Sequence, residues 1–393
     1  MRRPYVSTLA QVSTAHCISH VFIMLIPALL PLLPDALGVS YVELGIAVSL
    51  FNMMSATVQA PMGFVVDRFG PRRVLLVGIT IGTLCCFFLT AFPSYIGLII
   101  AAAILGCTNA VYHPSDYAIL SQAIKDSVMG RAFSVHSFAG FVGSAATPFL
   151  MVSLATVFSL PAAFFTAGLL GIATLCLFFF TRSDADDNRD AEDIVSSKER
   201  KINGNVTMIT FPILVLALLY VLLSLSTASI ERFSVSALLE GFAAPLSLAN
   251  TALTAFLFFS AVGVLCGGAL ADRTRKHGYV AASAFGAAAI LTAIVASGVL
   301  PSLALIPFFG LIGFLTGIIV PSRDMLVRAA SPKGGEGKTF GIVSCGFNIG
   351  GTIGPLLCGY FLDNGLPSFV FWATVVFMLL TMLLAVFQER RKC

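Results

Sequence analysis

The stretch Gly63-Phe-Val-Val-Asp67-Arg68-Phe-Gly70-Pro-Arg72-Arg73 decides how this chain folds. It is a short charged segment between two long apolar runs, as expected of a hairpin that joins two hydrophobic helices. A weaker copy, Gly268-Ala-Leu-Ala-Asp272-Arg273-Thr-Arg275-Lys276, begins 205 residues after the first. The chain therefore has two halves, and one half repeats the other.

The composition excludes a soluble globular protein. Of the 393 residues, 58% are hydrophobic and 11% are charged, whereas about 25% charged residues is usual in soluble domains. The formal net charge of +4 gives no sign of a nucleic-acid partner, because the cations lie in loops between apolar runs. We therefore expect an integral membrane protein whose main contact is the lipid bilayer.

Apolar runs of the length needed to cross a bilayer recur along the whole chain. A helix needs about 20 apolar residues to span the hydrocarbon core, and twelve such runs are present: 10–33, 41–66, 73–92, 95–123, 131–158, 160–180, 209–238, 246–271, 279–299, 302–329, 338–363 and 366–387. We predict an all-α membrane protein of twelve transmembrane helices, arranged as two pseudo-symmetric six-helix bundles around a central cavity.

The basic residues predict the domain limits and the orientation. An N-terminal bundle, 1–180, is followed by a linker of mixed charge, 181–208, a C-terminal bundle, 209–387, and a short tail, 388–393. All Lys and Arg residues except Arg232 and Arg323 lie at the N-terminus, in or beside the loops after even-numbered helices, or in the tail. By the positive-inside rule, we expect the linker and both termini to lie in the cytoplasm. The expected location of the protein is the plasma membrane.

The charged hairpin resembles the signature loop of the major facilitator superfamily. The matching positions are Gly63, Asp67, Arg68, Gly70, Arg72 and Arg73 in the first copy and Gly268, Asp272, Arg273 and Lys276 in the second. The resemblance implies a transporter without a cofactor. In physical terms, the glycines let two helix ends approach, and an Asp beside a helix N-terminus with cations nearby forms an electrostatic latch between conformations.

The repeat continues beyond the hairpin. Pro114-Ser115-Asp116 lies over Pro321-Ser322-Arg323 when the halves are aligned. Small residues line one face of the run 131–158, with Gly140 and Gly143 among them, and glycines line the matching face of 338–363. Because small residues allow close contact between helix backbones, we expect these two faces to form the interface on which the halves rock.

Ionisable residues inside the predicted helices mark the candidate site, because such groups are unfavourable in lipid. In the first half, His16 and His20 are four residues apart, and His113 and Asp116 are three apart, so each pair shares a helix face. We expect His20 and His113 to bind substrate. Asp116 is the expected proton carrier, hydrogen bonded to His113. For His16 an interfacial role and a functional role both stay open, and we assign His136 to packing or loop contacts.

The second half supplies cations. Arg323 is the counterpart of Asp116, so the two side chains could face each other across the cavity, and Arg232 lies beside Glu231 in the seventh helix. A guanidinium inside a membrane protein suits a carboxylate or phosphonate, although a strut between Arg and Asp is an alternative. The predicted substrate-binding residues are therefore His20, His113, Arg232 and Arg323, and the predicted proton-coupling residues are Asp116, His113 and Glu231.

Three short stretches indicate one type of transporter within the superfamily. The run from His20 to Pro31, followed by Ser40 to Gly45, is similar to fosmidomycin-resistance transporters, as is Tyr112-His113-Pro114. This similarity favours export. The segment 95–123 carries His113 and Asp116 where multidrug proton antiporters carry an embedded Arg.

The expected function is proton-coupled alternating-access transport of a small organic anion or amphiphilic compound by a monomer. One alternative is a carrier of a metal or metal complex, with His16, His20, His113 and Asp116 as possible ligands. A second is a sensor with a transporter fold and no flux. The sequence contains no nucleophile elbow, metalloprotease helix, P-loop or cofactor fingerprint, so we expect neither an enzyme nor an ATP-driven pump.

Overall fold

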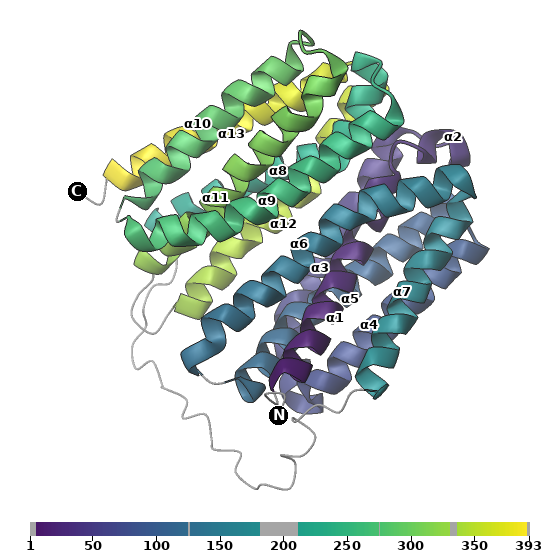
Figure 1. The fold of residues 1–393 in the computed structure, drawn as a ribbon, viewed down its shortest axis with the longest axis vertical. Helices are drawn as coiled ribbons and strands as arrows, with labels where there is room; N and C mark the ends of the chain where they lie inside the picture. Colours follow the sequence, from purple (N-terminus) through teal and green to yellow (C-terminus); the bar gives the residue numbers. More distant parts are fainter. Residues whose placement is uncertain (1–4, 125, 181–210, 275, 331–335, 391–393) are drawn as a thin grey trace, which may run out of the picture.

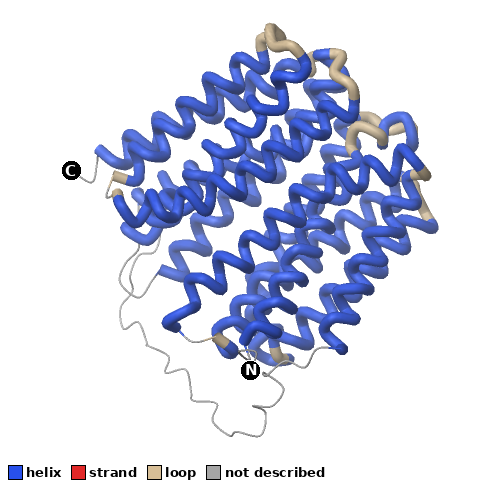
Figure 2. Tube along the Cα trace, viewed as in Figure 1, coloured by secondary structure: helices blue, strands red, loops and turns tan. Residues whose placement is uncertain are grey.

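A computed structural model of the chain describes residues 5–124, 126–180, 211–274, 276–330 and 336–390. This described part is built from helices and short loops and contains no strand (Figures 1 and 2). The helices are α1 (Tyr5–Leu29), α2 (Leu33–Leu37), α3 (Tyr41–Phe69), α4 (Pro71–Ala91), α5 (Tyr95–Ala123), α6 (Asp126–Val157), α7 (Leu160–Phe180), α8 (Phe211–Phe242), α9 (Leu246–Arg273), α10 (His277–Ala296), α11 (Leu305–Ala330), α12 (Glu336–Asp363) and α13 (Ser368–Arg390), with a 3₁₀ turn at Ser302–Ala304.

Within the described residues, 12 helices are long and apolar enough to cross a membrane, as predicted. The predicted linker 181–208 lies outside the described residues. Among the predicted helices, the first differs most from its expected limits when both ends are considered. The helix expected over 10–33 begins at Tyr5 and ends at Leu29, and a separate short helix, α2, follows it. Prolines at positions 31 and 34 lack the N–H that a continuing helix needs, so the chain turns here and restarts with Pro34 in the first turn of α2.

The charged hairpin has the predicted form. Gly70 separates α3 from α4 with a φ of 86°, a backbone conformation that favours glycine. Pro71 is the first residue of α4, where its fixed φ suits the start of a helix. The motif therefore produces a tight turn between two antiparallel membrane helices.

The two bundles repeat the same helix packing. In the first half α1 packs on α6, α3 on α5 and α4 on α7; in the second, α8 packs on α12, α9 on α11 and α10 on α13. The contacts between the halves are also symmetric, because α3 meets α12 and α9 meets α6, while α1 meets α8. Two pseudo-symmetric six-helix bundles therefore form the molecule, side by side (Figure 1).

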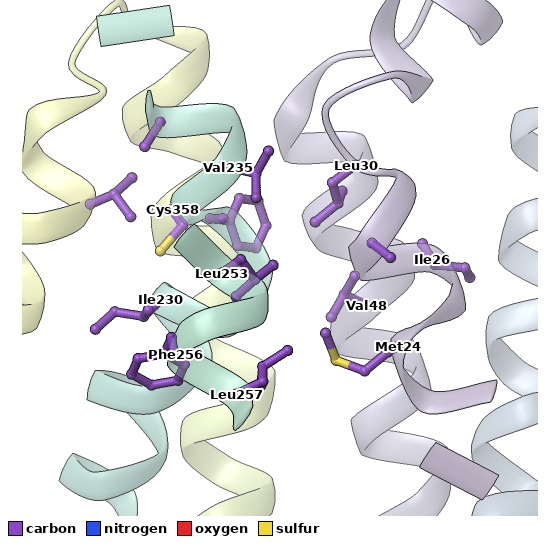
Figure 3. Packing of buried hydrophobic residues seen from close by; sticks show 14 of the residues in the cluster. Met24, Ile26, Leu30, Val48, Ile230, Val235, Leu253, Phe256, Leu257 and Cys358 are labelled. Atoms are coloured by element: carbon purple, nitrogen blue, oxygen red, sulfur yellow. The ribbon is translucent and has the colours of Figure 1, made fainter. Parts of the chain in front are cut away.

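A single apolar cluster continues from one half into the other. Figure 3 shows its members Leu30 and Val48 on helices of the first half and Val235 and Leu253 on helices of the second. Burial of such side chains holds the halves together in this conformation. A second buried cluster, around Tyr112, is made of first-half residues in the described part.

The two ends of the bundle differ in how closely the halves approach. We call the end where α1 begins and α13 finishes the terminal end, and the opposite end the α2 end (Figure 1). Toward the α2 end, Ser49 Oγ donates to Thr352 O at 2.6 Å and Asn250 Nδ2 donates to Pro148 O at 3.0 Å. On the terminal side of these contacts, a hollow of about 320 Å³ opens between α6 and α9, and another of about 320 Å³ opens between α3 and α12. The halves are therefore closed at the α2 end.

The glycine faces contribute to this arrangement in two different ways. A Cβ added at Gly359 of α12 would lie 2.5 Å from the carbonyl oxygen of Tyr41 in the other half, so this glycine belongs to the interface. A Cβ at Gly143 of α6 would instead meet Cys17 O of α1, in its own half, and one at Gly140 would meet the side chains of His16 and His20. The prediction that both faces form the interface is therefore wrong for Gly140 and Gly143, which pack against α1. It is also wrong for Gly346 and Gly350 of α12, where an added Cβ would meet carbonyl oxygens of α8 in the same half.

Candidate functional site

Three helices of the first half bring a carboxylate and two imidazoles together. Asp116 Oδ2 of α5 lies 3.5 Å from His16 Nδ1 of α1 and 3.5 Å from His136 Nε2 of α6. The three residues are 0%, 4% and 1% exposed, respectively. In the described part of the chain, both oxygens of Asp116 and these two nitrogens lack a hydrogen-bond partner. We call Asp116, His16 and His136 the histidine–aspartate cluster.

Two more imidazoles border the cluster. The ring of His16 stacks on that of His136 at a centroid distance of 4.0 Å, and lies 4.7 Å from the ring of His20 and 5.3 Å from that of His113. His20 Nδ1 is 2.8 Å from Ser144 Oγ on α6, a hydrogen bond that fixes its orientation. The four histidines of the first half therefore form one group.

Close packing of α1 on α6 makes this group possible. At Gly140, an added Cβ would lie 2.7 Å from His16 Cδ2 and 2.8 Å from His20 Nε2. Real Cβ atoms do not approach other atoms so closely, so residue 140 has to lack a side chain for the two imidazoles to occupy their positions. The glycine is thus a structural requirement of the site.

The partners of Asp116 differ from those expected. Among the described residues, its ion-pair contacts are with His16 and His136, so the hydrogen bond predicted with His113 is not formed, nor is a pair with Arg323. His113 is exposed, and its ring stacks beside Tyr117 at 5.9 Å. An i, i+3 spacing puts two side chains on one face, but neighbouring helices decide which partner is nearer.

Two histidines to which the sequence analysis gave no firm functional role, His16 and His136, belong to the cluster. α1 begins at Tyr5, so His16 lies about three turns into the helix, deeper than the predicted start at residue 10 implied. His136, assigned to packing or loop contacts, is buried against Asp116. The signal that could have found them is the concentration of four of the 5 histidines in one half.

In the second half, Arg323 of α11 packs against two aromatic rings that also contact each other. Its guanidinium carbon is 4.7 Å from the ring centroid of Tyr220 and 4.9 Å from that of Phe347, and these two rings are 4.8 Å apart. Tyr220 is buried and comes from α8, while Phe347 comes from α12. We call Arg323, Tyr220 and Phe347 the arginine cradle. It combines a fixed positive charge with apolar ring surface.

Arg232 lies closer to the α2 end, at the contact between the halves. Its Nη2 donates to Asn52 Oδ1 of α3 at 3.4 Å, while Nε and Nη1 are buried without a described partner. The guanidinium borders a cavity of about 10 Å³, on the order of one water molecule. In this conformation the surroundings of Arg232 leave no room for an organic substrate. Glu231, its neighbour in α8, is half-buried.

The hairpin residues make contacts at the terminal end. Arg72 donates to the carbonyl oxygen of Phe178 at 2.8 Å and to Gln11 Oε1 at 3.3 Å, so it ties α4 to α7 and α1 of its own half. Arg68 and Arg73 are exposed, as is Arg273 in the second copy. The side chains of Asp67 and Asp272 lie outside the described part of the structure. The latch role of the hairpins, Gly63 included, stays a prediction.

An apolar hollow inside the first half is not the candidate site. It measures about 750 Å³ and lies within the first half, lined by apolar side chains of α3, α4 and α5 with Arg73 at its edge. Binding sites combine an apolar wall with several convergent polar groups. Convergent polar groups are found instead in the histidine–aspartate cluster and at the arginine cradle.

Twelve membrane-spanning helices in two similar bundles, closed against each other at one end and with buried ionisable groups in both halves, define a membrane transporter. The family model of the Major Facilitator Superfamily matches residues 12–249 and 216–392. The chain belongs to this superfamily, a family of transporters and not of enzymes.

Individual relatives agree with this assignment. The chain is 23% identical to the fosmidomycin resistance protein of Escherichia coli over 98% of this chain and 93% of that protein. It is 28% identical to the multi-drug resistance efflux pump PmrA homolog of Lactococcus lactis, over 85% and 82% of the two chains. The fold matches the crystal structure of a bacterial homolog of the human lysosomal transporter Spinster, in an inward-facing and unoccupied conformation, with a TM-score of 0.80, 14% identity and coverage of 99% and 98%.

Proposed function

We propose that this protein is a secondary transporter that exports a small organic anion or an amphiphilic compound by alternating access, driven by protons. The observation that carries the proposal is the arginine cradle, in which the Arg323 guanidinium lies over Tyr220 at 4.7 Å and Phe347 at 4.9 Å. A guanidinium binds a carboxylate or phosphonate through paired hydrogen bonds, and the rings offer apolar contact to the rest of the molecule.

The first half would contribute the polar partners of the substrate. His113 is exposed, and His20 is hydrogen bonded to Ser144. Neither imidazole is a member of the histidine–aspartate cluster, so we propose that each offers a ring nitrogen to the substrate. Arg232 is enclosed in this conformation, and we propose that it meets the substrate only when the α2 end opens. Export is supported by the names of two relatives, a resistance protein and an efflux pump.

The proposal of proton coupling is supported by the buried ionisable groups and by the absence of a nucleotide-binding motif in the sequence. Asp116, His113 and Glu231 remain the predicted carriers. The distribution of Lys and Arg supports cytoplasmic termini and a plasma-membrane location, so the α2 end would face outward and the conformation described above would be open to the cytoplasm. Twelve helices suffice for one chain to act as a monomer.

Thermal stabilisation of the purified protein by a panel of organic anions and lipophilic cations tests the anion site. We expect anions with an apolar portion to raise the melting temperature of the wild type and not that of Arg323→Ala. Arg323→Lys, which keeps the charge but not the planar fork, should show a reduced effect. Arg273→Ala, at an exposed arginine of the second hairpin, is the matched control and should behave as the wild type does.

Anions that stabilise the wild type and Arg323→Ala equally would remove Arg323 from the site. Flux into or out of proteoliposomes under an imposed pH gradient tests the coupling. An anion that binds without any flux would point to the sensor alternative, and flux that ignores the gradient would remove protons from the mechanism.

A further inference from the structure

The spacing of the histidine–aspartate cluster differs from that of a hydrogen-bonded network. Asp116 Oδ2 lies 3.5 Å from both His16 Nδ1 and His136 Nε2, whereas direct hydrogen bonds between such atoms measure about 2.7–3.2 Å. One ligand atom from each residue lies within 4.8 Å of the other two. Asp116 Oδ2 therefore lies equally far from the two imidazole nitrogens, without a hydrogen bond to either.

That spacing matches the coordination shell of a small cation. With Zn–N and Zn–O bonds of about 2.0–2.2 Å, the ligand atoms of a tetrahedron are about 3.3–3.5 Å apart. The two distances to Asp116 fall at this value. Binding an ion between the three atoms would keep both distances to Asp116, and it would turn the stacked rings of His16 and His136 so that a nitrogen of each faces the ion.

The polar atoms of the cluster also lack other partners. Both oxygens of Asp116 and Nδ1 of His16 have no hydrogen bond within the described part of the chain, and neither does either ring nitrogen of His136. All three side chains are more than nine-tenths buried. A buried carboxylate without a partner is unfavourable, so a cation that binds here satisfies groups that the protein leaves unsatisfied.

We propose that His16, His136 and Asp116 bind one divalent first-row transition metal ion of the zinc type. Two imidazole nitrogens and a carboxylate oxygen select such ions over Ca²⁺ and Mg²⁺, which prefer oxygen ligands. Three protein ligands leave one position of a tetrahedron open, and the exposed His113 borders the cluster on the His16 side. The site lies wholly in the first half, so it does not depend on the anion proposed at Arg323. While the ion is bound, Asp116 is its deprotonated ligand, and proton coupling would rest on the other two predicted carriers, His113 and Glu231.

The decisive experiment uses the full-length protein in detergent, treated with a chelator and then titrated with Zn²⁺ or Co²⁺. We expect Zn²⁺ to raise the melting temperature, metal analysis to give one ion per chain, and Co²⁺ to give the visible absorption of a four-coordinate site that Zn²⁺ abolishes. Asp116→Asn and His136→Gln keep the size of each side chain and remove a ligand. Each should lower the Zn²⁺ affinity by at least about tenfold, the effect that loss of even an outer partner can have.

His277→Gln is the matched control, because it removes the one histidine of the second half, in α10. It should bind Zn²⁺ as the wild type does. A wild-type protein with no Zn²⁺ stabilisation and no Co²⁺ absorption overturns the proposal whatever the variants do. So does metal binding that persists in Asp116→Asn and His136→Gln. These readouts need no transport, so a failure here leaves the anion proposal standing, and a failure at Arg323 leaves the metal site standing.

Discussion

Asp363, the last residue of α12, accepts a hydrogen bond from the backbone N–H of Tyr41, the first residue of α3, at 2.8 Å. Its second carboxylate oxygen accepts from the N–H of Val42, also at 2.8 Å. The first N–H groups of a helix have no partner within it, and a negative charge is favoured there. A residue of the second half thus caps a helix of the first half, and this contact holds the α2 end closed.

Replacing Asp363 with Ala should therefore shift the protein toward a conformation open at the α2 end. Loss of a side-chain cap is worth about 1–2 kcal/mol, which changes a ratio of two states by a factor of about 5–30. Distances between spin labels at Ala36 and Val299, exposed positions at the α2 ends of the two halves, measure the shift. The population with the longer distance should increase.

The neighbouring Asn364 provides the control. Its Nδ2 donates to Tyr360 O of its own helix and its side chain is exposed, so Asn364→Ala should leave the label distances unchanged. Equal shifts in both variants would mean that the end of α12 is simply sensitive to substitution. Unchanged distances in Asp363→Ala would show that the cap does not hold the halves together.

A second prediction concerns the close approach of the α12 and α3 backbones next to this cap. A Cβ at Gly359 would lie 2.5 Å from Tyr41 O, so Gly359→Ala should force α12 away from α3 and open the α2 end. Overpacking of this kind costs about 1–3 kcal/mol. The same label distances report it.

Gly354, in the same helix, has room for a methyl group, since its nearest neighbour would be Leu225 Cδ2 at 3.6 Å. Gly354→Ala should leave the distances as they are and slightly stabilise α12, because alanine favours helix more than glycine does. An opening of equal size in both variants would contradict a specific contact at Gly359.

The twelve helices and their twofold repeat could be predicted from sequence because length and hydropathy are local properties, and the Gly63–Arg73 hairpin appears twice. The partners of Asp116 could not, because His16 and His136 come from helices far away in the chain. The same holds for Asp363, which lies at the end of the predicted helix 338–363. Its capping role depends on how the halves meet, and no periodicity in one helix encodes that.

A third prediction concerns Gly140. Its substitution by Ala would place a methyl group 2.7 Å from His16 and 2.8 Å from His20, so we expect a loss of stability of about 1–3 kcal/mol. Truncating the crowded side chains should relieve the clash. The triple variant Gly140→Ala, His16→Ala, His20→Ala should therefore be more stable than the sum of the separate effects predicts, a non-additivity typical of residues in contact. Strictly additive melting temperatures would show that α1 moves away from α6 without cost.

The last prediction concerns the pair that joins the halves near Arg232. Asn52 Oδ1 accepts from Arg232 Nη2 at 3.4 Å, a long contact, while Arg232 Nε and Nη1 are buried without a described partner. Asn52→Asp supplies a carboxylate to this guanidinium from the opposite half. It gives up the hydrogen bond from Asn52 Nδ2 to Val48 O, worth about 1 kcal/mol, but it gains a buried charge pair, and breaking such a pair costs about 3–5 kcal/mol.

We therefore expect Asn52→Asp to raise the melting temperature, shorten the distances between the labels at Ala36 and Val299, and slow transport, because leaving this conformation requires separating the new pair. Asn52→Leu keeps a similar volume and removes the acceptor, so it should shift the same distances in the opposite direction. Opposite signs in the two variants would assign the effect to charge across the interface. A shift of the same sign in both would show that packing around position 52, and not its pairing with Arg232, sets the balance between the two conformations.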